Sequence, residues 1–320
     1  MKKKLKIFLY KTVLNIKNIK EKDTLVIFSD QRHGSTWLME LLSKNINNCL
    51  INWESLQEDN RITPDRFNFS WKPILAIEYE NKEIINFFKK LHKFKYVNSW
   101  TVSQNRFSDV LKGKFVITKY VKANLLVPFL FNSINFINKP IFLLRHPIDV
   151  CISQINHFSK NDETLKNIKE VNIFISKYFS HIKLFDEKQK FNKLELQIIN
   201  WCINNCYTID RIKDLNIEVV FYSDLLMNPK LEIDKILKTV DSEYVMRNTQ
   251  ATKFNNYLRK PSFTIDKEHF KSDPKKQLTK NIEKLDEKTK DRIQNIFDHF
   301  SFKLYTAYSS DPYKGILLKS

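Results

Sequence analysis

Residues 24–38 read TLVIFSDQRHGSTWL, and this stretch decides the fold. Its opening apolar run, residues 24–29, is typical of a short parallel strand that is covered on both faces. Gly34 follows at the tightest point of a short loop, where glycine permits a positive φ and a close approach of a ligand to the backbone. Ser35 and Thr36 then open a helical pattern. Because N–H groups and the helix dipole attract negative charge at a helix start, this order predicts an anion site.

Three further apolar runs, at residues 114–119, 140–144 and 217–222, predict three more strands. A helical pattern follows each strand, over residues 35–44, 122–133, 147–158 and 230–240. This alternation predicts an α/β fold, with a central parallel β-sheet flanked by helices. A helical insertion at about residues 162–211 separates the last two strands, and its second half, residues 191–212, reads as a core-facing helix.

The sequence shows no internal repeat and no linker rich in proline or glycine. We therefore expect a basic N-terminal segment over residues 1–23, one domain over residues 24–310 and a C-terminal tail over residues 311–320. The first segment begins MKKKLKIFLYK. It predicts a basic amphipathic helix, and two interpretations stay open: a helix free in solution, or one that makes peripheral contact with a membrane.

The composition is that of a globular protein, since 42% of the 320 residues are hydrophobic and 28% are charged. Lysine and arginine outnumber aspartate and glutamate by 54 to 36, so the net charge of +18 favours anionic partners. No nucleic-acid motif accompanies this charge, and we expect no nucleic-acid partner. No apolar run approaches the ~20 residues that a membrane-spanning helix needs. The four cysteines suit a reducing, cytoplasmic compartment, and Cys202 and Cys206 read as buried packing thiols rather than zinc ligands.

A second polar segment, residues 142–153, reads FLLRHPIDVCIS. Arg145 ends a predicted strand, Pro147 suits the first turn of a helix, and Ser153 lies eight residues after Arg145. Because a guanidinium can bind phosphate through two hydrogen bonds, Arg145 and Ser153 predict a phosphate clamp. Asp149 is expected either to pair with Arg145 or to cap the helix.

Taken together, these segments resemble the sulfotransferases that use 3′-phosphoadenosine 5′-phosphosulfate (PAPS). The sequence RHGST at residues 32–36 is similar to the family's loop for the 5′-phosphosulfate, and Arg145 with Ser153 is similar to its site for the 3′-phosphate. Residues 220–229, VFYSDLLMNP, resemble the segment whose tyrosine lies near the adenine, and residues 300–305, FSFKLY, resemble the family's closing pattern. The resemblance spans residues 24–305 and is closest to the bacterial and carbohydrate-type branch.

The resemblance implies a P-loop-NTPase-like sulfotransferase fold, PAPS as the sulfate donor, no metal, and an acceptor hydroxyl on a glycan or glycolipid. It departs from the family at His33, which stands for a small residue, and at Ser223, which stands for an acidic one. The loop is not a Walker A motif, because it lacks a lysine directly before the hydroxyl pair. The implied donor-binding residues are Arg32, His33, Gly34, Ser35, Thr36, Trp37, Arg145, Ser153, Tyr222, Lys260 and Ser262.

The implied catalytic residues are Arg32, which would stabilise the leaving group, and a base that accepts the proton of the acceptor. Glu54 lies 22 residues after Arg32 and is the first candidate for that base, ahead of His33 and then His92. Lys119 and Lys122, at the end of the predicted strand over residues 114–119, are candidates to contact the transferring group or an anionic acceptor. Three alternatives stay open: a P-loop-like kinase, a basic nucleic-acid-binding protein, and a non-catalytic protein with this fold.

Overall fold

The computed structural model describes residues 2–56, 62–69, 72–158, 165–249 and 273–317. The chain divides into two compact units. The first, unit 1, comprises Met1–Leu144 and Leu215–Lys271, and the second, unit 2, comprises Arg145–Asp214 and Ser272–Ser320. Each unit is described by itself, and the predicted single domain over residues 24–310 stays a prediction.

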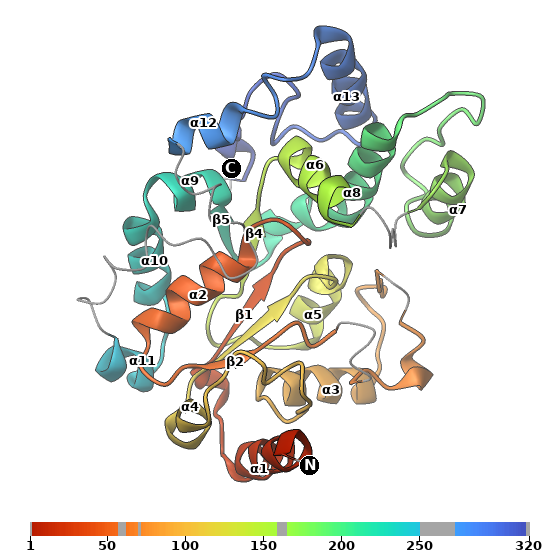
Figure 1. Ribbon diagram of the computed structural model, residues 1–320. Coiled ribbons are helices and arrows are strands. Elements are labelled where there is room, and N and C mark those ends of the chain that lie inside the picture. Colours follow the sequence, from red (N-terminus) through yellow and green to blue (C-terminus); the bar gives the residue numbers. More distant parts are fainter. Residues whose placement is uncertain (1, 57–61, 70–71, 159–164, 250–272, 318–320) are drawn as a thin grey trace. The chain divides into compact units, whose positions relative to one another are not determined.

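Unit 1 is built on a five-stranded, all-parallel sheet with the strand order β2-β3-β1-β4-β5 (Figure 1). Its strands are β1 (Thr24–Phe28), β2 (Leu50–Asn52), β3 (Val116–Tyr120), β4 (Ile141–Leu144) and β5 (Glu218–Phe221). The four strands predicted from apolar runs and the α/β class are confirmed. The remaining strand, β2, is only three residues long and ends in asparagine, so its sequence carries little strand signal.

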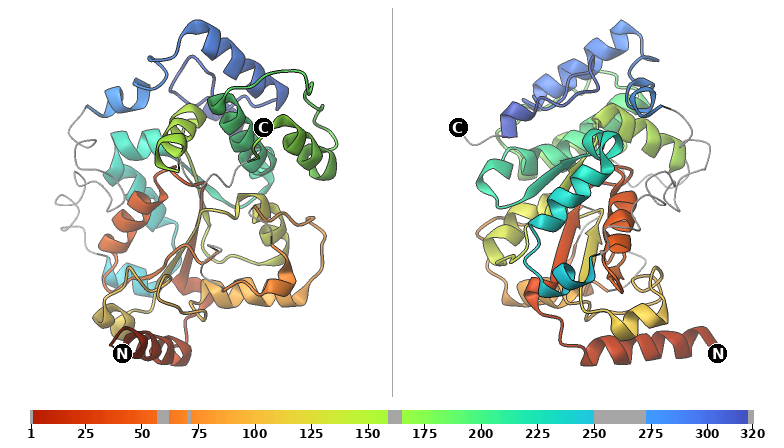
Figure 2. Two further views of the ribbon diagram at one scale, coloured as in Figure 1. Left: turned by 45° about the vertical axis from the view of Figure 1, so that its right-hand side comes forward. Right: turned by 90° about the vertical axis from the view of Figure 1, so that its left-hand side faces the viewer.

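The helices of unit 1 are α1 (Lys2–Ile16), α2 (Ser35–Asn45), α3 (Lys82–His92), α4 (Phe107–Lys112), α5 (Val127–Ser133), α9 (Tyr222–Met227), α10 (Pro229–Lys238) and α11 (Glu243–Asn248). Successive side chains of a strand point to opposite faces of the sheet. On β3, Lys119 contacts Thr36 of α2, whereas Tyr120 packs on Phe88 of α3. These contacts place α2 and α3 on opposite faces, as the right-hand view of Figure 2 shows.

The strand order places a topological switch point at β1. The strands β3 and β2 lie on one side of β1, and β4 and β5 lie on the other. In open parallel sheets, ligands bind beyond the carboxyl end of the strand at such a point. The loop that follows β1 is the sequence's predicted anion site, so topology and sequence indicate the same position.

Unit 2 is helical, and its helices are α6 (Pro147–His157), α7 (Ile168–Tyr178), α8 (Lys193–Ile209), α12 (Pro274–Thr279) and α13 (Glu287–His299). The longest of them, α8, contacts both α6 and α13, and its Trp201 and Cys202 are buried. The predicted insertion contains α7 and α8, and the predicted core-facing helix is α8. Cys206 is buried as well, which agrees with a packing role for both thiols.

Among the helices described, none combines the length and the apolar character needed to cross a lipid bilayer.

Candidate active site at the carboxyl end of β1

The loop after β1 turns sharply before α2 begins at Ser35. Ser29 and Asp30 continue from the strand and are buried. Two residues then adopt left-handed backbone conformations, Arg32 with a φ of 69° and Gly34 with a φ of 98°. A left-handed conformation is costly for a residue other than glycine and is often found at functional sites. The sequence predicted this conformation for Gly34, whereas Arg32 carries no local signal for it.

Gly34 cannot be replaced by a larger residue without a clash. A Cβ atom at this position would lie 2.6 Å from Cδ2 of Tyr222, at the start of α9. Gly34 also occupies the N-cap position of α2, where it offers no side chain to accept a hydrogen bond from the first N–H groups of the helix. The absence of a side chain therefore brings Tyr222 against the loop and leaves the capping role at this helix start to other groups.

Trp37 and Tyr222 contact each other in this structure. Their ring centroids are 6.2 Å apart and the rings meet edge to face at 63°. Both side chains are buried. A flat adenine base held between the two rings would require them to separate. Their assignment to the donor site stays a prediction.

His33 is completely buried, and its ring fixes the loop to the neighbouring strand. The Nδ1 atom lies 2.9 Å from the carbonyl oxygen of Leu143 in β4. Because a carbonyl oxygen only accepts hydrogen bonds, Nδ1 carries the proton and donates it. This geometry gives His33 a positioning role in the loop. Its role as a base stays a prediction.

Lys119 brings the predicted loop and the predicted base together. Its side chain is 1% exposed, and Nζ lies 2.7 Å from Oε1 of Glu54 and 3.1 Å from Oγ1 of Thr36. Nζ also lies 3.6 Å from the centroid of the Trp53 ring, which is cation–π geometry. Burial lowers the pKa of Lys119, and the neighbouring Glu54 carboxylate opposes that shift.

The backbone around Glu54 holds this carboxylate at the carboxyl end of the sheet. Glu54 lies two residues after β2 and has a φ of 39°. The N–H of Trp53 donates to the carbonyl of Thr101, which fixes the turn. The side chain of Glu54 is 18% exposed, so one part of the carboxylate contacts Lys119 while solvent reaches another. A carboxylate that is both oriented and accessible can accept a proton.

The sequence did not assign a role to Trp53, which covers the Lys119 ammonium. A signal was available, since Trp53 directly precedes Glu54 at the end of a short strand. The structure places Lys122 just beyond β3 and buries it. Its contact with the transferring group stays a prediction.

His92, the third candidate for the base, lies in the core of unit 1. It is the last residue of α3, and its ring packs against Tyr120 and Phe136. Burial lowers its pKa to about 3, so the imidazole is neutral at physiological pH. This position agrees with the amphipathic helix that the sequence indicated.

The second predicted anion segment begins in β4 of unit 1, and its polar residues, from Arg145 onward, belong to unit 2. Arg145 directly follows β4, and its guanidinium lies 3.6 Å from Oδ2 of Asp149. The predicted pair is thus confirmed, and it is His146 rather than Asp149 that caps α6, because its Nδ1 accepts a hydrogen bond from the N–H of Ile148. Asn281 donates to the other oxygen of Asp149 at 2.6 Å. Ser153 lies on α6, two turns into the helix, as predicted.

The late basic loop of the predicted donor site, with Lys260 and Ser262, lies outside the described residues, so its assignment stays a prediction. Arg32 belongs to unit 1, whereas Arg145 and Ser153 belong to unit 2. Their union in one nucleotide site is likewise a prediction.

No family model matches this chain, and no curated protein matches it significantly. Solved structures do match it. The sulfotransferase domain from the curacin biosynthetic pathway is 14% identical with a TM-score of 0.42, and the match covers 88% of this chain and 98% of that one. Retinol dehydratase, in complex with androsterone and the inactive cofactor PAP, is 14% identical with a TM-score of 0.33, and the match covers 89% of this chain and 74% of that one. Similarity at this level does not by itself establish a shared activity.

Proposed function

We propose that this protein is a PAPS-dependent sulfotransferase that transfers a sulfuryl group to a hydroxyl. The observation that carries the proposal is the position of Lys119, whose Nζ contacts both Thr36 of the predicted anion loop and Glu54, the predicted base. These residues come from separate stretches of sequence, and the sequence analysis had named each of them as a candidate for this reaction.

The loop suits an anionic donor in three ways. The start of α2 presents backbone N–H groups, Gly34 lets the loop adopt its left-handed turn with Tyr222 packed against it, and Lys119 contributes a buried positive charge. When bound, PAPS would supply the sulfuryl group for transfer. Arg32, Lys119 and the N–H groups of Ser35 and Thr36 would stabilise the negative charge that grows on the leaving phosphate. Such fixed donors are typically worth about 2–4 kcal/mol each.

Glu54 would accept the proton of the acceptor hydroxyl. Its ion pair with Lys119 orients one oxygen while solvent reaches the side chain. Lys119 thereby links the two halves of the reaction, because one ammonium lies beside both the anion loop and the base. His33 would hold the loop in place through Leu143.

Arg145 and Ser153 would bind the 3′-phosphate of the donor, with Asp149 and Asn281 holding the guanidinium of Arg145 in position. The acceptor stays as the resemblance implies it, a glycan or glycolipid hydroxyl. The acceptor class rests on the family resemblance alone.

Thermal unfolding in the presence of three ligands tests the proposal. We expect 3′-phosphoadenosine 5′-phosphate to raise the unfolding midpoint, and ATP and a short oligonucleotide to leave it unchanged. Arg145→Ala should lose the shift, measured against its own ligand-free midpoint. A shift with ATP alone would favour a kinase, and a shift with the oligonucleotide alone would favour a nucleic-acid-binding protein; either result contradicts the proposal.

A substitution of the base separates binding from transfer. Glu54→Gln keeps the shape of the side chain but removes the proton acceptor, so we expect an unchanged midpoint shift and a transfer rate at least about 100-fold lower. Glu83→Gln, a change of the same kind at an exposed position on α3, is the matched control and should transfer at the wild-type rate. An unchanged rate in Glu54→Gln would show that Glu54 is not the base.

A further inference from the structure

The helix α1 carries two apolar faces. Tyr10 and Leu14 are buried against the rest of unit 1. Four other apolar side chains are exposed, at 59%, 64%, 42% and 78%: Leu5, Phe8, Leu9 and Ile16. With 3.6 residues per turn, these four positions fall within a stripe about 100° wide, on the side of the helix opposite to the buried pair.

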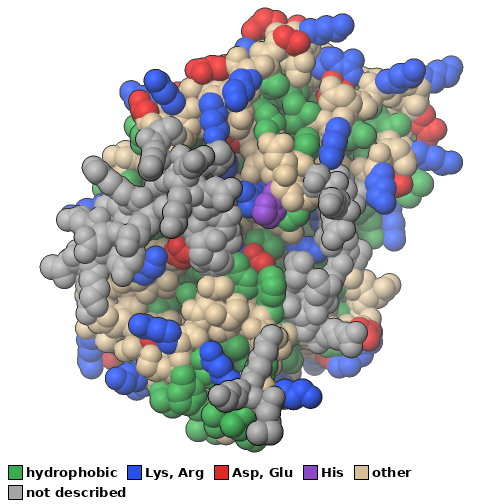
Figure 3. All heavy atoms as spheres, viewed as in Figure 1, with side chains coloured by type: hydrophobic (Ala, Val, Ile, Leu, Met, Phe, Trp, Pro, Cys, Tyr) green, Lys and Arg blue, Asp and Glu red, His purple; other side chains and the backbone are tan. Residues whose placement is uncertain are grey.

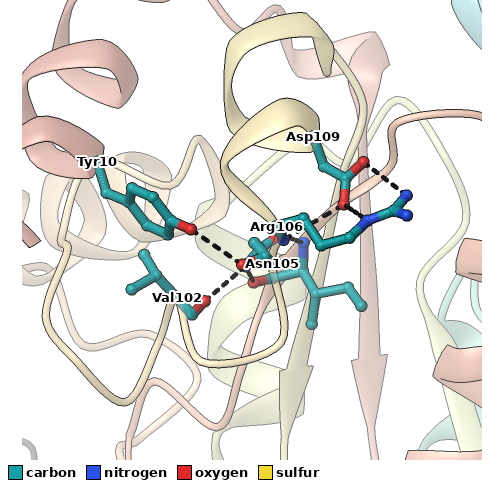
Figure 4. A network of polar contacts seen from close by, with 6 residues as sticks. Tyr10, Val102, Asn105, Arg106 and Asp109 are labelled. Carbon is teal, nitrogen blue, oxygen red and sulfur yellow. Dashed lines mark hydrogen bonds and ion pairs between the residues drawn. The ribbon is translucent and has the colours of Figure 1, made fainter. Parts of the chain in front are cut away.

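The buried face of α1 is firmly attached to the sheet. The hydroxyl of Tyr10 donates to the carbonyl of Asn105 at 3.2 Å (Figure 4). The Tyr10 ring stacks on Phe107 with 5.6 Å between the ring centroids. The side chain of Asn105 in turn exchanges two hydrogen bonds with the backbone of Ile51 in β2, at 2.8 and 2.7 Å. The helix is thus connected through one loop to an edge strand of the sheet.

The carboxyl end of α1 is also held. Nζ of Lys95 donates to the carbonyls of Leu14, Asn15 and Lys17, at 3.1, 2.9 and 2.6 Å. Nζ of Lys17 donates to the carbonyls of Leu111 and Gly113, both at 2.8 Å. Because these bonds fix the rotation of the helix, the exposed stripe points outward in the folded unit.

Lysines border the stripe on both sides. On a helical wheel, Lys4 and Lys11 lie on one edge and Lys6 on the other, and all three are exposed. The first 20 residues contain seven lysines and no acidic residue. An apolar stripe flanked by lysines is the pattern of a helix that lies in the interface of a membrane with anionic lipids.

The neighbouring helix α4 lies on the buried side of α1, since the ring of its Phe107 stacks on Tyr10. It packs against α1 and exposes Phe107 and Leu111, at 39% and 50%. Figure 3 shows hydrophobic side chains gathered at the foot of the view, where Figure 1 draws α4 and α1, with Lys and Arg side chains beside them. We define the basic apolar face as the exposed residues Leu5, Phe8, Leu9 and Ile16 of α1 with the lysines that border them, Lys4, Lys6 and Lys11.

We propose that the basic apolar face docks on a lipid bilayer that carries anionic headgroups. The apolar side chains would enter the boundary between headgroups and acyl chains, and the lysines would contact the headgroup phosphates. Charge complementarity favours a bilayer over a second copy of this chain, because a symmetric contact would bring the same lysines against each other.

The docked orientation has a consequence for the site. Lys17 binds the carbonyl of Gly113, just before β3, so α1 lies at the amino ends of the parallel strands. The loop at Gly34 lies at the carboxyl end of β1, and five residues at about 3.3 Å each separate the two edges of the sheet there. A protein docked through the basic apolar face therefore presents this loop to the aqueous side.

Vesicle flotation tests the proposal. We expect the wild-type protein to float with vesicles of phosphatidylcholine and phosphatidylglycerol, and not with phosphatidylcholine alone. Phe8→Glu removes one aromatic side chain that would enter the bilayer and adds a negative charge, so binding should weaken at least about tenfold. Ile173→Glu is the matched control, since Ile173 is 61% exposed on α7, and it should bind like the wild type.

The charge contribution is tested by Lys4→Glu combined with Lys11→Glu, which should weaken binding to the anionic vesicles. Equal binding of wild type and Phe8→Glu would overturn the proposal, as would wild-type binding that does not distinguish the two vesicle types. A wild-type dimer in solution that Phe8→Glu converts to a monomer would assign the face to a second copy and would also overturn it. Circular dichroism and the unfolding midpoint establish that each variant is folded.

Discussion

Two loops in this protein lead from a buried strand into a helix, and they are built differently. After β1, the loop contains two left-handed residues, Arg32 and Gly34, and the N-cap residue of α2 has no side chain. After β4, the chain passes through Arg145 and His146 straight into α6, and the imidazole of His146 caps the helix. The first loop contains left-handed residues, and no side chain of its N-cap residue covers the N–H groups at the start of α2. In the second loop, a side chain caps the start of the helix.

This difference indicates what each loop can bind. Backbone N–H groups at a helix start bind an anion at close range, but only where no side chain already caps them. A capped helix start has its first N–H groups occupied, and any anion must be bound by a side chain such as Arg145, which Asp149 holds at 3.6 Å. The comparison fits a phosphosulfate at the first loop and a single phosphate at the second.

The largest expected effect breaks the first loop. In Gly34→Ala, the new Cβ would lie 2.6 Å from the Tyr222 ring, and alanine would have to adopt a φ of 98°. We expect a loss of about 1–3 kcal/mol in the free energy of unfolding and at least about 100-fold weaker binding of 3′-phosphoadenosine 5′-phosphate. Chemical denaturation and calorimetric titration measure the two quantities.

Gly315→Ala is the control for this change. A Cβ at Gly315 would meet only the Tyr313 ring, at an ordinary contact distance of 3.6 Å. This variant should match the wild type in stability and in binding. If Gly34→Ala behaves in the same way, the first loop does not need its glycine and the comparison fails.

A second expected effect is a loss of unfolding free energy at acidic pH, and it comes from a residue outside both loops. His92 is buried with a pKa of about 3 in the folded protein, against 6.5 for the ordinary side chain. Between these values the unfolded state binds more protons, so the folded state loses stability as the pH falls below 6.5, by about 1.4 kcal/mol per pH unit from this group. His92→Phe should flatten the curve of unfolding free energy against pH in this window, and an unchanged curve would contradict the buried position.

The smallest expected effect sharpens the comparison at the second loop. Burial lowers the pKa of His146, so its protonation below pH 6.5 also favours the unfolded state and removes the lone pair on Nδ1 that caps α6. His146→Asn keeps an oxygen that can accept from Ile148, so the variant should lose less stability on acidification than the wild type does. We expect His146→Ala to cost about 0.5–2 kcal/mol at neutral pH, measured by denaturant unfolding.

Much of the fold follows from sequence pattern, because continuous apolar runs such as residues 140–144 have few alternatives to a buried parallel strand. The glycine loop was also predictable, since one of only three glycines lies between a strand and a helix. The strand β2 was harder to predict, because three residues ending in Asn52 depend on pairing with β3 rather than on local preference. The left-handed conformation of Arg32 has no signal in the local sequence.

The candidate site was predictable in its parts but not in its contacts. The family resemblance indicated Glu54, and the end of the predicted strand over residues 114–119 indicated Lys119. The 2.7 Å contact between them, however, depends on the pairing of strands distant in sequence. The cation–π contact between the Trp53 ring and the Lys119 ammonium likewise arises only when β2 and β3 lie side by side.

A crystal structure of the protein with 3′-phosphoadenosine 5′-phosphate tests the central claim most directly. The account predicts the 5′-phosphate against the backbone of Gly34, Ser35 and Thr36, with Lys119 within hydrogen-bond reach of it or of its leaving oxygen, and the 3′-phosphate on Arg145 and Ser153. A nucleotide bound away from Gly34, or one whose two phosphates contact only one of these two segments, would contradict it.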